Sequence, residues 1–149
     1  MRAPLLVACV LVATAAAQEF SKDIPFVKAT SVADVKKEVA AQGKPAMVFV
    51  TQPWCGACKG LKNSVSKSDS PKVLMKNFVV VHAKEDEGKD WQWPGANDGY
   101  VPRVYFLDKA GEYVAYKAPN PNYKYFLAQA DQVETAAKAL LKAAGSDEL

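Results

Sequence analysis

Metal ligands and cysteines are scarce in this sequence of 149 residues, which has three cysteines and one histidine. A structural zinc ion takes about four cysteine or histidine ligands. Cys55 and Cys58 could supply two of them, but the one histidine, His82, lies inside an apolar segment. We therefore interpret His82 as a residue of the core or of a sheet rather than as a ligand, and we expect no metal site.

Long apolar segments and a strong charge of one sign are also missing. A membrane-spanning helix needs about 20 apolar residues, and the apolar segment Leu5–Val12 is shorter than this. The 19 basic and 16 acidic side chains give a formal net charge of +3 and are interspersed along the chain. We therefore expect neither a membrane span nor a nucleic-acid partner.

The first 17 residues have the pattern of a secretory signal peptide. Arg2 supplies the positive start, Leu5–Val12 the apolar centre, and residues 15–17 the small side chains that precede a cleavage site. We expect cleavage directly after residue 17. Cys9 would leave with the removed peptide.

The last four residues, Ser146–Leu149, match the Lys-Asp-Glu-Leu signal for retention in the endoplasmic reticulum (ER) at three positions. An accidental acidic tail is the alternative, but a signal peptide upstream favours retrieval by the ER-retention receptor. We therefore expect an ER-lumenal protein in which residues 18–145 form one domain. Disulfides are permitted there, and Cys55 and Cys58 would be the two cysteines of the mature chain.

The pattern of apolar and turn-forming residues predicts an α/β fold, in which a mixed sheet is covered by helices on both faces. The expected helices are one between the cap Ser31 and the stop Gly43, one from Lys59 onward, a short one over 72–77 and a last one over 131–144. The expected strands are 46–51, 78–83, 103–107 and 112–116, and a long surface loop is expected over 84–100.

The segment Cys55-Gly56-Ala57-Cys58 lies where the first strand ends and the second helix begins. A thiol at a helix N-terminus faces unpaired backbone N–H groups and the positive end of the helix dipole. Both favour the thiolate, which makes such a cysteine reactive near neutral pH. The motif therefore predicts thiol–disulfide exchange, with Cys55 as the attacking sulfur and Cys58 as the resolving one.

Three other uses of a Cys-x-x-Cys motif remain as alternatives. Half of a zinc site lacks further ligands, as described above. Covalent haem attachment requires a histidine directly after the second cysteine, where this chain has Lys59. A purely structural disulfide would close a loop too short to constrain the unfolded chain much.

Several segments together resemble one family of small ER-lumenal thioredoxin-like proteins, which is related to the anterior-gradient proteins. The matching segments are Trp54–Lys59, Asn77–Val79, Glu85–Glu87, Asp98–Arg103, Phe106–Asp108 and Tyr123–Phe126. The resemblance implies a single thioredoxin-like domain that reduces or forms disulfides in cysteine-containing secretory client proteins. It implies glutathione as a redox partner and no bound cofactor. The alternative within the same family is a non-catalytic client-binding or folding factor of the anterior-gradient kind.

The same resemblance assigns roles to residues around the motif. It makes Cys55 the exposed nucleophile and Cys58 its buried disulfide partner. It makes Pro102 a cis-proline, which leaves the Val101 backbone free to pair with an extended client peptide. The alternative for Pro102 is an ordinary trans-proline at the start of a strand. Trp54 is either a core aromatic or an apolar lip for the client, and we expect it to be partly exposed.

Two residues depart from the better-known relatives. Protein disulfide isomerase has a histidine between its cysteines, where this chain has Ala57. Thioredoxin and the isomerase carry a buried carboxylate six residues before the first cysteine, where this chain has Phe49. Proton transfer at Cys58 would then use water or a more distant group such as Glu85. We therefore expect slower exchange than in those relatives.

Overall fold

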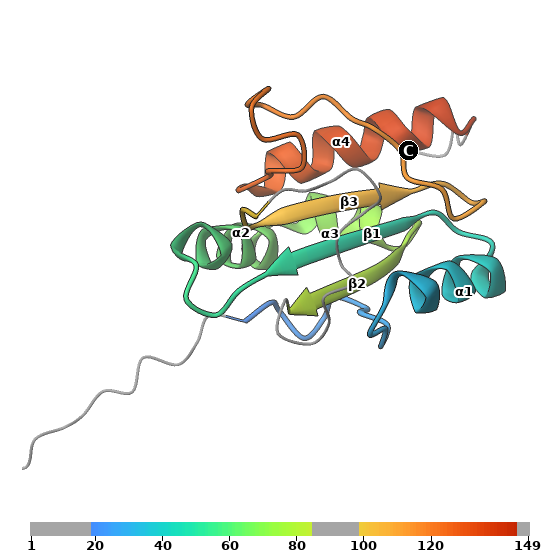
Figure 1. Cartoon of the computed structure of the whole chain (residues 1–149), viewed down its shortest axis with the longest axis horizontal. Coiled ribbons are helices and arrows are strands. Elements are labelled where there is room, and N and C mark those ends of the chain that lie inside the picture. Colours follow the sequence, from blue (N-terminus) through green and yellow to red (C-terminus); the bar gives the residue numbers. More distant parts are fainter. Residues whose placement is uncertain (1–18, 85–98, 146–149) are drawn as a thin grey trace, which may run out of the picture.

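The computed structural model describes residues 19–84 and 99–145, and its centre is a three-stranded mixed sheet in the order β2-β1-β3 (Figure 1). The middle strand β1, Ala46–Thr51, pairs in parallel with β2, Val79–Lys84. It pairs in antiparallel fashion with β3, Arg103–Leu107. The three strands lie within one residue of the positions that the sequence predicts.

The helices cover the two faces of this sheet. They are α1, Val32–Gln42; α2, Gly56–Lys67; α3, Asp69–Met75; and α4, Ala130–Ala143. Buried residues of α1 join one apolar cluster with one face of the sheet, whereas those of α2, α3 and α4 join a second cluster with the other face. The predicted α/β fold with helices on both faces is confirmed.

Strand β1 is buried along its whole length, because both of its faces are covered. Side chains alternate between the faces of a strand. Accordingly Met47 and Phe49 belong to the cluster of α2, α3 and α4, while Val48 and Val50 belong to that of α1. A strand covered on both faces carries a continuous apolar run rather than an alternating one, and this explains the sequence of β1.

Helix α1 begins and ends as predicted. The Ser31 hydroxyl accepts a hydrogen bond from the Asp34 N–H at 3.2 Å, which satisfies a donor that the first turn leaves unpaired. Gly43 has a φ of 63° and its N–H donates to the Val39 carbonyl at 2.9 Å. Glycine adopts this left-handed conformation without steric cost, so it ends the helix directly before β1.

Helix α3 begins at Asp69, three residues earlier than the sequence predicts. We expected Pro71 to keep the chain from being helical until residue 72, but Pro71 lies in the first turn. Backbone N–H groups in the first turn have no acceptor within the helix, so a proline there removes no hydrogen bond.

The predicted strand over residues 112–116 does not form. Tyr113 makes one isolated bridge with Leu107, and the Val114 N–H donates to the Phe106 carbonyl at 2.9 Å. The ladder ends there because the Tyr116 hydroxyl, rather than its backbone N–H, donates to the Val104 carbonyl at 2.7 Å. The Tyr116 hydroxyl thus occupies the Val104 carbonyl, which would otherwise accept a backbone hydrogen bond from a continued strand.

Some predictions fall outside the described residues. These are the signal peptide over 1–17, most of the loop over 84–100 including Glu85, and the tail over 146–149. Among the helices of the described part, none combines the length and the apolar character that a membrane crossing requires.

We predict that Phe106→Ala lowers the free energy of unfolding by about 3–5 kcal/mol, because it removes a fully buried ring from the larger cluster. The Phe106 ring lies 6.0 Å from that of Phe78 and 5.2 Å from that of Tyr116. Urea unfolding followed by circular dichroism measures the loss. As a control, Val73→Ala on the exposed side of α3 should change the value by less than about 0.5 kcal/mol. Equal effects of the two substitutions would contradict the assigned core.

Candidate redox site

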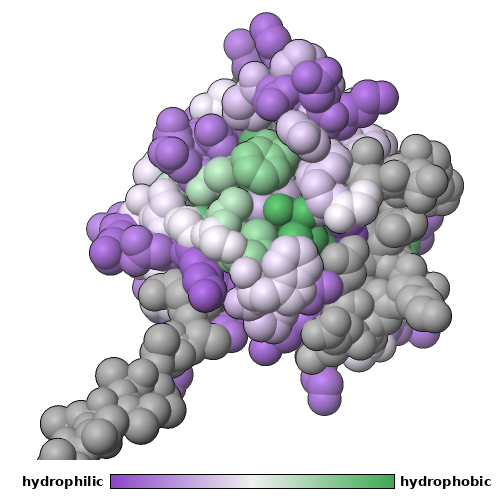
Figure 2. All heavy atoms as spheres, turned by 60° about the vertical axis from the view of Figure 1, so that its left-hand side comes forward, coloured by the Kyte–Doolittle hydropathy of each residue, from purple (hydrophilic) through white to green (hydrophobic). Residues whose placement is uncertain are grey.

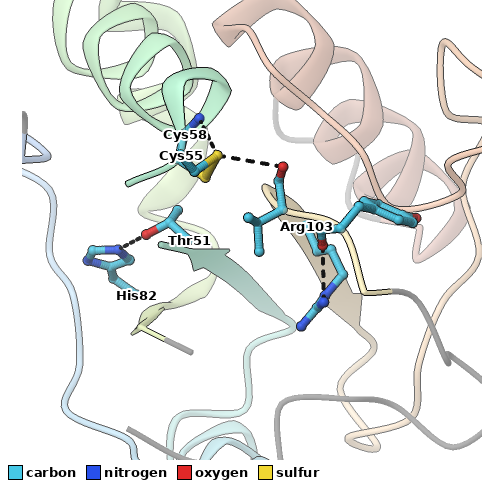
Figure 3. The surroundings of a disulfide bond; sticks show 7 residues. Thr51, Cys55, Cys58, His82 and Arg103 are labelled. Carbon is cyan, nitrogen blue, oxygen red and sulfur yellow. Dashed lines mark hydrogen bonds between the residues drawn. A yellow bond between two sulfur atoms is a disulfide. The ribbon is translucent and has the colours of Figure 1, made fainter. Parts of the chain in front are cut away.

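Cys55 and Cys58 form a disulfide at the N-terminus of α2, directly beyond the carboxyl end of β1 (Figure 3). Their Cα atoms are 5.2 Å apart, a separation that a disulfide spans without backbone movement. Cys55 is the N-cap residue with extended backbone, and Cys58 lies in the first turn. Cys55 therefore lies in the short connection between β1 and α2, and Cys58 lies in α2 itself.

The Cys55 sulfur accepts a hydrogen bond from the Cys58 N–H at 3.0 Å. This amide is one of the donors that the first turn of α2 leaves unpaired, and the positive end of the helix dipole lies beside it. Once the disulfide is reduced, the same amide would donate to a Cys55 thiolate. A hydrogen bond to the charged form favours that form, so this contact would favour the thiolate of Cys55.

The second contact of Cys55 is with the segment that precedes β3. The Cys55 sulfur lies 3.6 Å from the Val101 carbonyl oxygen, and the Val101–Pro102 peptide bond is cis. The cis bond that the family resemblance implies is therefore confirmed. In the reduced protein a Cys55 thiol could donate to this carbonyl. The cis-proline segment thus lies directly against the Cys55 sulfur.

The exposure of the two cysteines differs in part from the expectation. Cys58 is fully buried, as expected, but Cys55 is also buried, with 5% of its surface exposed. The cause is that the Cys55 sulfur turns inward, onto the helix amide and the Val101 carbonyl. Trp54 next to it is 74% exposed, so it is a surface lip and not a core aromatic.

Phe49 lies six residues before Cys55, at the position where the better-known relatives have a carboxylate, and it packs among other aromatic rings. Phe49 is fully buried, and its ring lies 5.1 Å from that of Phe20 and 6.3 Å from that of Phe26. Its neighbour in β2 is His82, in direct register. Phe49 itself therefore contributes no proton and no charge to the chemistry of the sulfurs.

His82 is a sheet residue, as the sequence predicts. Its Nε2 lies 2.8 Å from the Thr51 hydroxyl (Figure 3). Its ring lies 5.0 Å from that of Phe20. Burial, helped by the positive charge of Lys62, lowers the pKa of His82 to about 4, so the ring is neutral at pH 7. In the described part of the chain, no three histidine, cysteine or acidic side chains are grouped closely enough to hold a metal ion.

Two buried cations near the site were missed by reasoning from the sequence. The Arg103 guanidinium donates to the Tyr100 carbonyl at 3.1 Å and lies 6.0 Å from the centre of the Tyr105 ring, so it fixes the turn before β3. Lys62 lies in α2, four residues after Cys58, and its side chain is 5% exposed. That spacing of four, which places both residues on one face of a helix, is a signal that could have identified Lys62.

A hollow of about 470 Å³, lined partly by aromatic rings, includes Tyr100, the residue before Val101 in the sequence. Its lining is Tyr100, Pro119, Asn120, Tyr123, Phe126 and Gln132. The Tyr125 N–H donates to the Tyr100 hydroxyl oxygen at 3.0 Å, which holds the Tyr100 ring in place. Figure 2 shows the end of the molecule at which α2 lies, where a hydrophobic area is surrounded by hydrophilic residues.

Residues 27–109 match a protein-family model described as thioredoxin-like. The match covers more than half of the chain and includes the disulfide and the cis-proline. The chain belongs to the thioredoxin-like family. Together with the Cys55–Cys58 disulfide in a Cys-x-x-Cys motif, this membership indicates a thiol–disulfide oxidoreductase.

We predict that His82 makes the protein less stable as the pH falls from about 6.5 to about 4. Over this range the unfolded chain binds a proton at His82, while the folded chain does not bind one until about pH 4. The unfolded state is therefore favoured, by a total of about 2–3 kcal/mol. At pH 8 and above the histidine has almost no effect, because it is neutral in both states.

Urea unfolding at pH 7 and at pH 4.5 measures this loss, and His82→Asn isolates the part that His82 contributes. The variant should lose less stability than the parent over this interval. Because the chain has one histidine, its ring signals in a nuclear magnetic resonance titration are unambiguous. A midpoint near 6.5 in the folded protein would contradict the neutral, buried ring.

Proposed function

We propose that this protein is an ER-lumenal thiol–disulfide oxidoreductase that reduces or forms disulfides in secretory client proteins. Its place would be in the small family that includes thioredoxin domain-containing protein 12 and is related to the anterior-gradient proteins. One observation carries the proposal: the Cys55 sulfur lies between the Cys58 amide of α2, at 3.0 Å, and the carbonyl before the cis-proline, at 3.6 Å.

In the reducing direction the Cys55 thiolate attacks one sulfur of a client disulfide. The Cys55–client bond forms, the client disulfide breaks, and the other client sulfur leaves as a thiolate that takes up a proton. Cys58 then attacks Cys55, forms the disulfide present in the structure and releases the second client thiol. The client gains two electrons and the pair loses two. Two molecules of glutathione would return the pair to its reduced form and become oxidised glutathione.

Client binding is assigned to Trp54, Val101 and Pro102, which frame Cys55. The exposed Trp54 ring, next to Cys55 in sequence, offers an apolar surface. The Val101 backbone lies against the Cys55 sulfur just before β3 begins, where an extended peptide could pair with it. A client backbone aligned there would bring its own disulfide to Cys55.

The proposed compartment rests on two segments of the sequence. The signal-like segment over residues 1–17 would direct the chain to the ER lumen, and Ser146–Leu149 would return it there through the ER-retention receptor. A redox pair needs an oxidising or buffered compartment to cycle, and the ER provides one with glutathione. The proposed partners are therefore client proteins, glutathione and this receptor.

A non-catalytic client-binding factor is the second candidate, and the exposed apolar surface favours it. Trp54 is 74% exposed and Tyr123 is 45% exposed, and Tyr123 belongs to the aromatic hollow. Such a surface could hold an unfolded client without any exchange of disulfides. The two functions differ in whether they require the Cys55 sulfur.

We predict that Cys55→Ser abolishes reduction of a model protein disulfide, with a loss of at least about a hundredfold, because a hydroxyl cannot replace the thiolate. Cys58→Ala should still complete the first step and accumulate mixed disulfides with clients in cells. The double variant Cys55→Ser with Cys58→Ala is the matched control and should trap none. Mass spectrometry of non-reduced complexes identifies the trapped clients.

Client aggregation assays decide between the two candidates. If Cys55→Ser prevents client aggregation as well as the parent does and the parent reduces no disulfide, the binding factor is correct and the oxidoreductase is wrong. Loss of reductase activity in Cys55→Ser, together with mixed disulfides that depend on Cys55, supports the enzyme.

A further inference from the structure

The most unusual charged group near the disulfide is Lys62, which is buried although lysine is rarely found inside a protein. Its side chain is 5% exposed, and its ammonium lies 3.5 Å from a carboxylate oxygen of Glu19. Glu19 is half exposed and lies 3.9 Å from the ammonium of Lys84 through its other oxygen. A partly solvated carboxylate thus balances one buried cation.

Helix geometry directs the Lys62 side chain toward Cys58. The two residues are four apart in α2, and both belong to its buried face. Side chains of a helix tilt toward its N-terminus and cover the residue about one turn earlier. For Lys62 that residue is Cys58, so we infer that its side chain extends along the helix toward the turn that carries Cys58.

The Lys62 charge also acts on the strands beneath the disulfide. It is close enough to His82 of β2 to disfavour the protonated form of that ring. His82 is the direct neighbour of Phe49, the position at which relatives carry a buried carboxylate. A buried positive charge on α2 therefore acts next to this position, where relatives carry a negative one.

We propose that Lys62, with Glu19 as its counter-ion, stabilises the Cys58 thiolate and so sets the rate at which Cys58 resolves a mixed disulfide. This inference rests on the proposed exchange reaction. Lys62 touches neither the client nor the reacting bond, so it is a positioning residue that acts through its charge. A positive charge nearby favours a thiolate over a thiol.

The step itself balances without a further reagent. Cys58 gives its proton to solvent, and its thiolate attacks the Cys55 sulfur of the mixed disulfide. The Cys55–Cys58 bond forms, the Cys55–client bond breaks, and the client sulfur leaves as a thiolate that takes up a proton. Lys62 raises the fraction of Cys58 that is ready to attack, and Glu19 limits that effect.

Other charged groups around Cys58 have weaker claims to this role. His82 is neutral at pH 7, and Lys84 lies at the end of β2 with 42% of its side chain exposed. Arg103 lies in β3 and donates to the Tyr100 carbonyl. Lys59 is adjacent to Cys58 in sequence but exposed, so water and salt screen its charge.

The test uses the mature chain with Cys55→Ser, in which Cys58 is the one remaining thiol. Ultraviolet absorbance of the thiolate against pH gives the midpoint of Cys58 ionisation. Lys62→Met should raise this midpoint by about one pH unit, because the favourable charge is gone. Glu19→Gln should lower it, because Lys62 is then unbalanced, and Lys62→Arg should leave it near the parent value.

Lys59→Met is the matched control, since it removes the same charge from an exposed position one residue from Cys58. Its midpoint should change by less than a third of the change in Lys62→Met. With Cys55 restored, Lys62→Met should slow release of client from a preformed mixed disulfide about threefold at neutral pH, because the higher nucleophilicity of the more basic thiolate partly offsets the lower thiolate fraction. The deficit should shrink as the pH rises.

A merely structural Lys62 gives a different result. The variants would then lower stability in urea unfolding, while the midpoint of Cys58 would stay within the change seen for Lys59→Met, and the proposal would be wrong. If Lys62→Met does not fold, Glu19→Gln decides alone, because a midpoint that is unchanged or raised overturns the proposal. The titration requires no turnover, so it is independent of whether the protein acts on clients.

Discussion

The pairing of β1 with β3 is the constraint on which the rest of the structure depends. The register places Val50 beside Arg103, so the chain just beyond β1 and the chain just before β3 lie at the same edge of the sheet. The first of these segments carries Cys55 and the second carries Val101. Because β1 is buried on both faces, a slip of one residue would turn its apolar side chains to the wrong faces. The core therefore fixes the 3.6 Å contact between the sulfur and the carbonyl.

Helix α2 provides the groups that determine the reactivity of the two cysteines. Its first turn supplies the amide that binds the Cys55 sulfur, and its buried face supplies both Cys58 and Lys62. The wall opposite this face is aromatic, since Phe49 packs with Phe20 and Phe26. The amide and a positive charge on the helix each favour a thiolate. Among the described residues no carboxylate is buried near the sulfurs to change this balance. If the proposed role of Lys62 is correct, the reactivity of the site depends on backbone dipoles and on one lysine.

The sequence predicts those parts that local pattern decides. Ser31 and Gly43 bound α1, and the apolar runs locate the three strands within one residue. Where tertiary contacts decide, the predictions fail. A hydrogen bond from the Tyr116 side chain ends the expected hairpin, and the inward turn of the sulfur buries Cys55. Burial of Lys62 depends on Glu19, 43 residues away in sequence, and no local pattern signals such a contact.

The most direct test of the account is whether the Cys55–Cys58 disulfide opens and closes reversibly. The mature protein would be equilibrated in buffers with graded ratios of reduced to oxidised glutathione, quenched with acid and alkylated, and the modified thiols counted by mass spectrometry. The account predicts one two-electron transition, in which Cys55 and Cys58 change together within the range that glutathione buffers. A disulfide that stays closed in every buffer would be a structural cross-link, and that result would contradict the account.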